Sequence, residues 1–349
     1  MSVTVSLPEI LRPGRLGKPV AIALLFGLIL VQLTGCSGGE PKAIEVNDQP
    51  YLALRDVAKT FGLRYQHLDD GKRVQLSDRH HTLSFTLHHR AMPFDGTPVW
   101  LGFPVAAHED RLYISQADID TVLRPLLKPR TLPPPYPPAP KHIIIDPGHG
   151  GKDPGAENRA LGINEKTTVL DLARQLKRNL ENAGYRVTLL RTGDYFIPLP
   201  ERAARANALE GDLFLSLHFN AAENDQVSGL ETFVIPPPGH PSTQRATPTE
   251  GDQIILSGNN YDAWNLLAAF SIQQAMVDDT GRVDRGVKRA RFIVLRDLTM
   301  PGVLIEGGFL SNPDEARLIS TPAYREKIAE GIARGVIHYH AHLKSLPDS

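Results

Sequence analysis

The chain has 349 residues, of which 41% are hydrophobic, enough for two packed domains. Its formal net charge of −1 lacks the basic excess typical of nucleic-acid-binding proteins, so no nucleic-acid partner is expected. Because Cys36 is the single cysteine, no disulfide can form within the chain.

Residues 1–35 are predicted to be a signal peptide. Basic residues precede an apolar run over 20–31, which is too short to span a bilayer comfortably and is typical of a signal-peptide core. The run leads into Leu33-Thr34-Gly35-Cys36, which resembles the lipobox of bacterial lipoproteins. The resemblance implies cleavage before Cys36, lipidation of that residue and anchoring to a membrane of the bacterial cell envelope. Ser37 would permit sorting to the periplasmic face of the outer membrane. The alternative is an uncleaved anchor.

A small α+β domain is predicted over residues 44–130. The segment 51–62 has the apolar spacing of a helix, 74–76 and 83–87 alternate as half-buried strands do, and Asp95-Gly96 is typical of a hairpin turn. A further helix is expected to begin near Ser115. The region resembles the copper amine oxidase N-terminal domain-like modules of envelope proteins, and this resemblance implies no copper. It implies a wall-facing spacer or binding domain.

Residues 131–140 contain six prolines and are predicted to be a linker in polyproline II conformation. They would separate the small domain from a catalytic domain over residues 141–345.

From His142 onward, strand and helix patterns alternate, which predicts an α/β domain with an open, mostly parallel sheet covered by helices on both faces. Residues 236–260 form an insert rich in Pro, Gly, Thr and Ser, which we interpret as a mobile lid or a substrate-gripping loop. Strands are expected at 142–146, 186–191, 212–218, 230–235, 291–296 and 302–306, and helices at 165–183, 200–209, 261–280, 313–320 and 323–343.

Four polar residues are expected to meet at one edge of this sheet. His149 follows the first strand, Glu165 opens the first helix, and His218 and Glu306 end two further apolar strands. The carboxyl ends of parallel strands lie along one edge, so these distant residues can converge there. Taken singly, Glu165 also suits a helix's first turn and His218 also suits a hydrogen-bonded core position. An ionised Glu306 at a buried strand end is costly without a metal, a cation or hydrogen-bond donors.

The composition of this set points to metal-assisted hydrolysis. Two histidines and a carboxylate can hold zinc tetrahedrally and leave its fourth position open, as catalytic zinc requires. A second carboxylate can then take a proton from water. These residue types alone leave open which glutamate binds the metal and which accepts the proton.

Residues 142–343 resemble the zinc-dependent N-acetylmuramoyl-L-alanine amidases of the type 3 family. The resemblance implies that His149, Glu165 and His218 bind one Zn²⁺ ion and that Glu306 is catalytic. It implies hydrolysis of the amide bond between N-acetylmuramic acid and L-alanine in peptidoglycan, with an activator protein as a further partner. The matching motifs are Ile145–Ala156, Asn164-Glu165-Lys166, Leu190-Arg191-Thr192, Leu199–Arg202, Ala206-Asn207, Leu215–Ala221 and Glu306–Asn312.

Supporting roles are expected for four further residues. Asp146 would orient a ligand histidine or cap a turn, Asn220 would face substrate, and Arg191 and Arg202 would tie loops to the sheet or contact substrate. Two rival functions are a catalytically inert peptidoglycan-binding scaffold and a zinc carboxypeptidase acting on the stem peptide.

Overall fold

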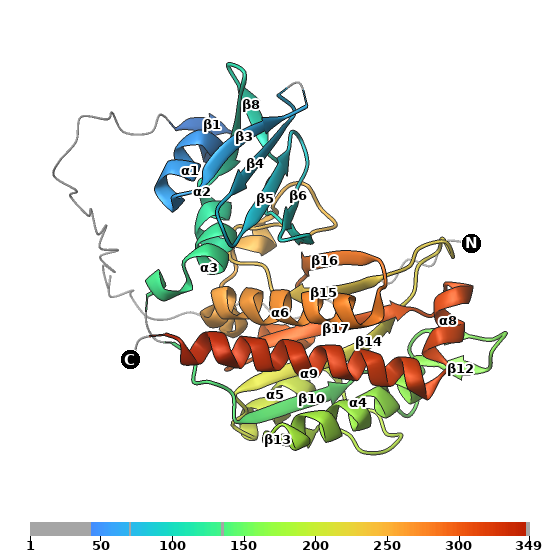
Figure 1. Ribbon diagram of the computed structural model, residues 1–349. Coiled ribbons are helices and arrows are strands. Elements are labelled where there is room, and N and C mark those ends of the chain that lie inside the picture. The colour runs from blue at the N-terminus through green and yellow to red at the C-terminus, as the bar shows by residue number, and fades with distance from the viewer. Residues whose placement is uncertain (1–42, 70, 134–135, 347–349) are drawn as a thin grey trace, which may run out of the picture. The chain divides into compact units, whose positions relative to one another are not determined.

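The computed structural model describes residues 43–69, 71–133 and 136–346 (Figure 1). The predicted signal peptide and the predicted lipidation site Cys36 lie outside these residues. Within the described ranges, no helix combines the length and apolar character needed to cross a membrane.

The C-terminal region is built on a mixed, mainly parallel sheet. Its order is β13 (Arg186–Leu189), β10 (His142–Pro147), β14 (Leu213–Asn220), β17 (Gly302–Phe309), β15 (Leu230–Val234) and β16 (Asp284–Arg289). Neighbouring strands run parallel except for β15 and β17, which run antiparallel. This is the α/β arrangement expected from the alternating sequence pattern.

Helices cover both faces of this sheet because successive strand residues point to opposite sides. Ile143 and Ile145 pack into a core with α4 (Glu165–Asn182), α6 (Asp262–Thr280) and α9 (Pro322–Lys344). Ile144 faces a second core with α5 (Leu199–Ala208) and α7 (Ile293–Arg296). A short hairpin of β11 (Glu157–Asn158) and β12 (Ile163–Asn164) leads into α4, and α8 (Pro313–Ile319) follows β17.

The N-terminal region contains antiparallel strands and short helices. The Asp95-Gly96 turn joins β6 to β7, and both turn residues have positive φ, as such a tight hairpin requires. The helix of 51–62 starts later than predicted, because Tyr51 to Ala53 pair as a strand with β9. The elements are β1 (Ile44–Val46), β2 (Gln49–Ala53), α1 (Leu54–Phe61), β3 (Arg64–Leu68), β4 (Arg73–Ser77), β5 (Thr82–Thr86), β6 (Ala91–Phe94), β7 (Thr97–Trp100), β8 (Ala106–His108), β9 (Arg111–Ser115), α2 (Gln116–Asp118), η1 (Ile119–Leu123), α3 (Arg124–Leu127) and η2 (Pro129–Thr131).

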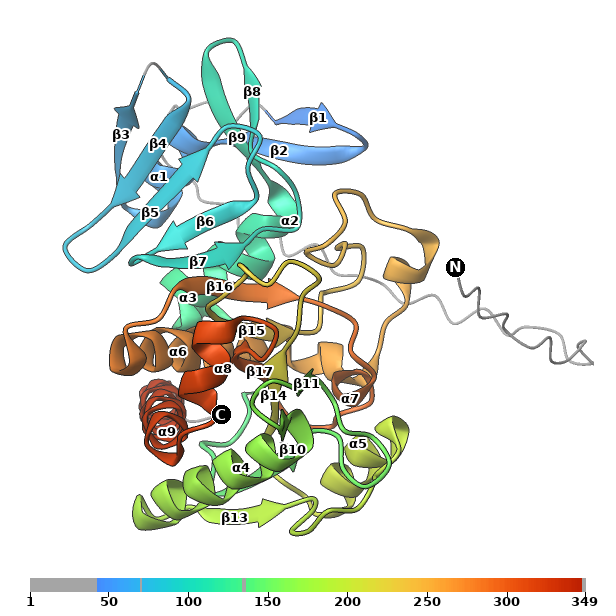
Figure 2. The same ribbon diagram turned by 90° about the vertical axis from the view of Figure 1, so that its right-hand side faces the viewer.

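One continuous sheet joins the two regions (Figure 2). Strand β7 runs parallel to β16, with Val99 opposite Val287. Gly286 has a φ of +80°, and a Cβ atom there would collide with the carbonyl oxygen of Pro98, so this contact requires glycine. The boundaries of separate domains stay a prediction. The N-terminal and C-terminal regions are in direct contact through β7 and β16.

The proline-rich segment packs on the protein surface. Pro137 and Pro140 are buried, and the Tyr136 ring meets the Trp264 ring of α6 edge-on with 5.8 Å between the centroids. The described part of this predicted linker therefore lies against α6, because its side chains have an apolar partner there.

The insert (residues 236–260) is folded between the two regions. It contains η3 (Glu250–Gln253) and the first part of η4 (Ser257–Tyr261). Asp252 is buried and accepts hydrogen bonds from both terminal nitrogens of Arg245 at 2.8 Å. Arg90 of the N-terminal region donates to the backbone oxygens of Thr243 and Arg245. These contacts make the insert a link between the regions. Its Thr243 and Gln244 line a cavity together with Glu306, and its role as a lid or a substrate-gripping loop stays a prediction.

One predicted strand is wrong. Residues 291–296 contain helix α7, and the edge strand β16 at 284–289 was not predicted. The apolar run from 292 to 295 turns toward the second core as a helix, in which Val294 and Leu295 are buried.

Candidate metal centre

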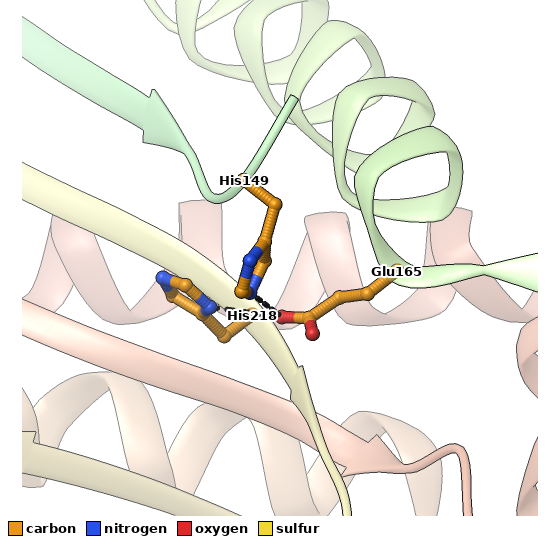
Figure 3. Close-up of side chains that lie close together, drawn as sticks. All are labelled: His149, Glu165 and His218. Carbon is orange, nitrogen blue, oxygen red and sulfur yellow. Dashed lines mark hydrogen bonds and ion pairs between the residues drawn. The ribbon is translucent and has the colours of Figure 1, made fainter. Parts of the chain in front are cut away.

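Three of the predicted site residues converge at one point (Figure 3). One carboxylate oxygen of Glu165, Oε1, lies 3.0 Å from His149 Nε2 and 2.8 Å from His218 Nδ1. The donor atoms of the three residues all lie within 4.8 Å of one another. Two imidazole nitrogens and one carboxylate oxygen are therefore close enough to share a metal ion.

Each of these side chains is positioned by a different element. His149 sits just past β10 in the left-handed region, with a φ of 58°, which turns its ring toward the sheet edge. Glu165 is the first residue of α4, where Asn164 caps the helix by accepting a hydrogen bond from Thr167 N. His218 projects from β14.

The loop between His149 and Glu165 must approach both of them closely. Gly155 has a φ of +68°, and a Cβ atom at that position would collide with the carboxylate of Glu165 and the ring of His149. The glycine lets Ala156 N donate to Glu165 Oε2 at 2.8 Å. Oε2 of Glu165 is thus occupied, while Oε1 faces the two histidines and also accepts a hydrogen bond from Phe219 N at 3.1 Å.

The electrostatics of this cluster favour an ionised carboxylate. Burial raises the pKa of Glu165, but hydrogen bonds and charge interactions with His149 and His218 outweigh this and leave the pKa well below its usual range. Burial likewise lowers the pKa of His149, and the carboxylates of Glu165 and Asp153 more than offset this and raise it.

Glu306 lies beside this cluster on the central strand β17. It is in register with His218 on β14 and with Glu231 on β15. Glu306 is buried, and its Oε2 has no hydrogen-bond partner among the described residues. Burial raises the pKa of this carboxyl well above its usual range, and the charges of Glu165 and Glu231 raise it further.

A cavity of about 380 Å³ connects these groups. Glu306 shares its lining with His149, Glu165 and His218, and the remaining wall is largely apolar, including Leu199 and Phe219. The donor atoms of His149, Glu165 and His218 are two imidazole nitrogens and one carboxylate oxygen within 4.8 Å of one another, a combination with which proteins bind zinc. The donor set therefore fits a divalent metal ion.

The sequence signature of the N-acetylmuramoyl-L-alanine amidase family, Amidase_3, matches residues 143–338. This range contains all of the metal-centre residues described above. The chain belongs to this amidase family. The match covers the whole β/α sheet region and leaves the N-terminal region outside it.

Several known proteins are similar to this region. The amidase region is 34% identical over 223 residues to N-acetylmuramoyl-L-alanine amidase AmiC of Neisseria meningitidis serogroup B, covering 56% of this chain and 52% of that protein. It is 33% identical to AmiA of Escherichia coli K12, covering 56% of this chain and 75% of that protein. The chain thus spans about half the length of the Neisseria relative. A crystal structure of an N-acetylmuramoyl-L-alanine amidase from Clostridium difficile 630 matches with a TM-score of 0.47 and 33% identity, covering 58% of this chain and 97% of that one.

The residue that supports His149 in the amidase is Asp153, which sequence analysis missed. Its Oδ2 lies 2.9 Å from His149 Nδ1, the ring nitrogen that does not face Glu165. The sequence signal for this role was a carboxylate four residues after the histidine, in a glycine-rich loop. Asp146, which was expected to orient a histidine, is instead bound by Arg202 Nη1 at 2.6 Å and Ser216 Oγ at 3.0 Å. That prediction is wrong because Asp146 points toward α5.

The two arginines of the amidase motif hold the loop after β10. Arg191 is fully buried and donates to the backbone oxygens of Pro147, Gly148 and Lys166. Arg202 Nη2 donates to the carbonyl of His149 at 2.7 Å. Both side chains therefore position the loop that carries His149. Of the two predicted roles, this is the tying of loops to the sheet and not substrate contact.

Asn220, which was expected to face substrate, lines the cavity and also anchors a neighbour. Its Nδ2 donates to Glu231 Oε1 at 2.7 Å, and its Oδ1 accepts from Ala221 N.

Proposed function

We propose that this chain hydrolyses the amide bond between N-acetylmuramic acid and L-alanine in peptidoglycan, with one zinc ion held by His149, Glu165 and His218. Family membership supports the reaction, and the donor set supports the metal. The observation that carries the proposal is the buried, unpaired Oε2 of Glu306 in the cavity that those three residues line.

The protein's own residues divide the chemistry between them. A bound zinc ion supplies Lewis-acid chemistry, which polarises a carbonyl and makes water more acidic. Glu306 Oε2 accepts a proton from the attacking water and later delivers it to the amine of L-alanine. Asp153 holds the His149 ring in place through Nδ1, which leaves Nε2 directed at the metal position.

The test separates metal binding from proton transfer. His149→Ala and His218→Ala should lose most of the zinc together with activity. Glu306→Gln preserves the side-chain shape but cannot accept a proton, so zinc should remain while the rate falls by about 10²–10⁴-fold. The measurements are zinc content by atomic absorption and peptide release from purified sacculi, with and without a chelator.

Two outcomes would contradict the assignment. Near-normal peptide release by Glu306→Gln would exclude it as the base, and zinc loss in that variant would make it a ligand. Mass spectrometry of the products identifies the bond, because only an amidase releases a stem peptide whose L-alanine has a free amine. Metal-loaded protein that binds sacculi without releasing peptide would identify an inert scaffold.

We further propose that the protein works in the bacterial cell envelope, anchored through a lipid on Cys36 at the periplasmic face of the outer membrane. The lipobox-like sequence before Cys36 supports this location. An activator protein remains a further proposed partner. The N-terminal region is proposed to be a copper amine oxidase-like module, supported by its strand and helix pattern.

A further inference from the structure

One face of the continuous sheet carries Glu306 and extends beyond it into the N-terminal region. Ile305 of β17 and Val99 of β7 both pack into the core that contains α4, α6 and α9. Successive strand residues point to opposite sides, so Glu306 and Trp100, which follow them, share the face that looks away from this core. Both side chains line one cavity of about 610 Å³. A substrate at Glu306 can therefore extend toward Trp100.

Beyond this cavity the same face continues over strands β7 to β3 (Figure 2). Ser84 of β5 lies between Leu83 and Phe85, which are buried in the core, and it therefore points away from the core. Gln75 of β4 is in register with Ser84, and Gln66 of β3 is in register with Gln75, so all three side chains point the same way. All three are partly or fully exposed. We call this outward surface of β3 to β7 the open face.

A row of uncharged side chains crosses the open face. From the cavity outward, the row consists of Pro98, Pro93, Ser84, Gln75 and Gln66. The two prolines are in register with each other and offer flat apolar surfaces, while the outer three residues offer one hydroxyl and two amide groups. Neighbouring strands lie about 4.8 Å apart, so the four steps from β7 to β3 extend the row about 19 Å past the cavity.

This composition distinguishes between classes of polymer. A nucleic acid or another polyanion requires basic side chains along its path, and an apolar partner requires a continuous apolar patch. The row provides neither. Sugar rings have apolar faces that pack on flat side chains, and their hydroxyl and acetamido groups form hydrogen bonds with hydroxyl and amide side chains. A glycan strand therefore matches the row in both respects.

We infer that the open face binds the glycan strand of peptidoglycan, and that the muramic acid whose amide bond is cleaved belongs to that same strand. The inference rests on the proposed amidase function, because that function brings a glycan polymer to Glu306. Continuity with the cavity argues for this occupant, since the open face begins where Trp100 and Glu306 share a wall. The N-terminal region then makes the enzyme favour long strands over isolated disaccharides.

The experiment compares two substrates with the same stem peptide: a single disaccharide-peptide and long, uncrosslinked glycan strands. The zinc-loaded full-length protein should have a KM about tenfold lower for the long strands, as expected for two further hydrogen bonds. Gln66→Ala/Gln75→Ala should bring the two KM values within about threefold, with kcat and the use of the short substrate unchanged. Gln116→Ala/Asn182→Ala, the matched control, removes two amide groups of α2 and α4 outside the open face and should keep the difference.

Binding of denuded glycan strands keeps the open face distinct from the reaction, because these strands contain no bond that the proposed reaction cleaves. Calorimetry should show that Gln66→Ala/Gln75→Ala weakens their Kd by about tenfold, with unchanged zinc content and Tm. Free stem peptides should not displace the strands from the wild type.

Three outcomes would overturn the inference: equal KM values for the two substrates in the wild type, equal binding of denuded strands by the wild type and the glutamine variant, or displacement of the strands by free stem peptides. If the wild type releases no peptide from either substrate while the Kd ratio between wild type and variant persists, the proposed reaction fails and the open face stands. If the wild type cleaves both substrates and this Kd ratio is absent, the reaction stands and the open face fails.

Discussion

Arg202→Met tests whether the site depends on a buried ion pair that lies beneath it. Arg202 and Asp146 are almost completely buried, with 1% and 0% of their side chains exposed. Arg202 donates to Asp146 Oδ1 at 2.6 Å, to Pro147 O at 2.9 Å and to His149 O at 2.7 Å. Methionine has similar length and fills the space but provides none of these donors.

The expected loss of stability is large. Without Arg202, the carboxylate of Asp146 retains a single side-chain hydrogen bond within the described residues, from Ser216 Oγ at 3.0 Å. Removing one partner of a buried ion pair costs about 3–5 kcal/mol, because the other charge is left uncompensated. Native domains are stable by about 5–15 kcal/mol, so this is a substantial share of the total. Zinc affinity should also fall by about 10–100-fold, since the backbone of His149 loses an anchor.

Urea unfolding of the metal-free protein, followed by circular dichroism, measures the first effect, and competition with a zinc-binding dye measures the second. Arg205→Met, on the same helix, is the matched control: the side chains of its ion pair with Glu201 are 44% and 46% exposed, and the pair should contribute less than about 1 kcal/mol. Adding Asp146→Asn to Arg202→Met removes the orphaned charge and should recover part of the stability. A loss below about 1 kcal/mol in Arg202→Met, or a double variant as unstable as the sum of the single ones, would refute the reasoning.

Two predictions concern other parts of the chain. Cys36→Ser should block lipidation and leave an unprocessed or mislocalised precursor, as read by membrane fractionation and mass spectrometry; a normally processed, membrane-bound variant would contradict the lipoprotein proposal. In the insert, burial raises the pKa of Asp252, but hydrogen bonds from Arg245 and Thr249 outweigh this and lower it to about 2. A lowered pKa means that the carboxylate stabilises the fold above its ordinary value of 3.8 and loses this effect as the pH falls toward 2. Asp252→Asn should therefore be less stable than the wild type at neutral pH and equal to it near pH 2 in urea unfolding; an unchanged pH dependence would contradict this.

The strand and helix pattern of the amidase region was largely predictable because its apolar periodicity is strong. The run Ile143 to Ile145 is buried on both faces, as continuous apolar strands in parallel sheets are. The convergence of His149, Glu165 and His218 followed from one topological rule, that strand ends share an edge. Their roles as ligands and that of Glu306 as the base remain predictions.

The strand wrongly predicted at 291–296 shows why a short local pattern does not determine secondary structure. An apolar run of four residues suits either a buried strand or a buried helix, and periodicity cannot distinguish them. The true strand β16 reads Asp-Arg-Gly-Val-Lys-Arg, a composition typical of a loop. Its basic side chains contact distant partners, including Glu231 for Lys288 and the backbone oxygen of Thr121 for Arg289. Those partners come from other elements, so no local window contains them.

The prediction that Asp146, and not Asp153, contacts a ligand histidine failed for a similar reason. Both aspartates flank His149, and the direction of each side chain depends on backbone angles in the glycine-rich loop. His149, Gly150 and Gly151 all have positive φ, which turns the chain back so that Asp153 reaches the histidine ring. Glycine permits such angles without specifying them, so the sequence alone does not decide between the two carboxylates.

The pairing of β7 with β16 also determines which backbone groups lie at the border of the sheet. A strand at the border of a sheet exposes unpaired N–H and C=O groups, which can recruit a strand from another molecule. Here the N-terminal region covers that border of the amidase sheet and moves the exposed end outward to β3, whose first residue is Arg64 and which carries polar side chains. A truncated protein that begins after the proline-rich segment would uncover β16, and we expect its exposed backbone groups to favour strand pairing between molecules.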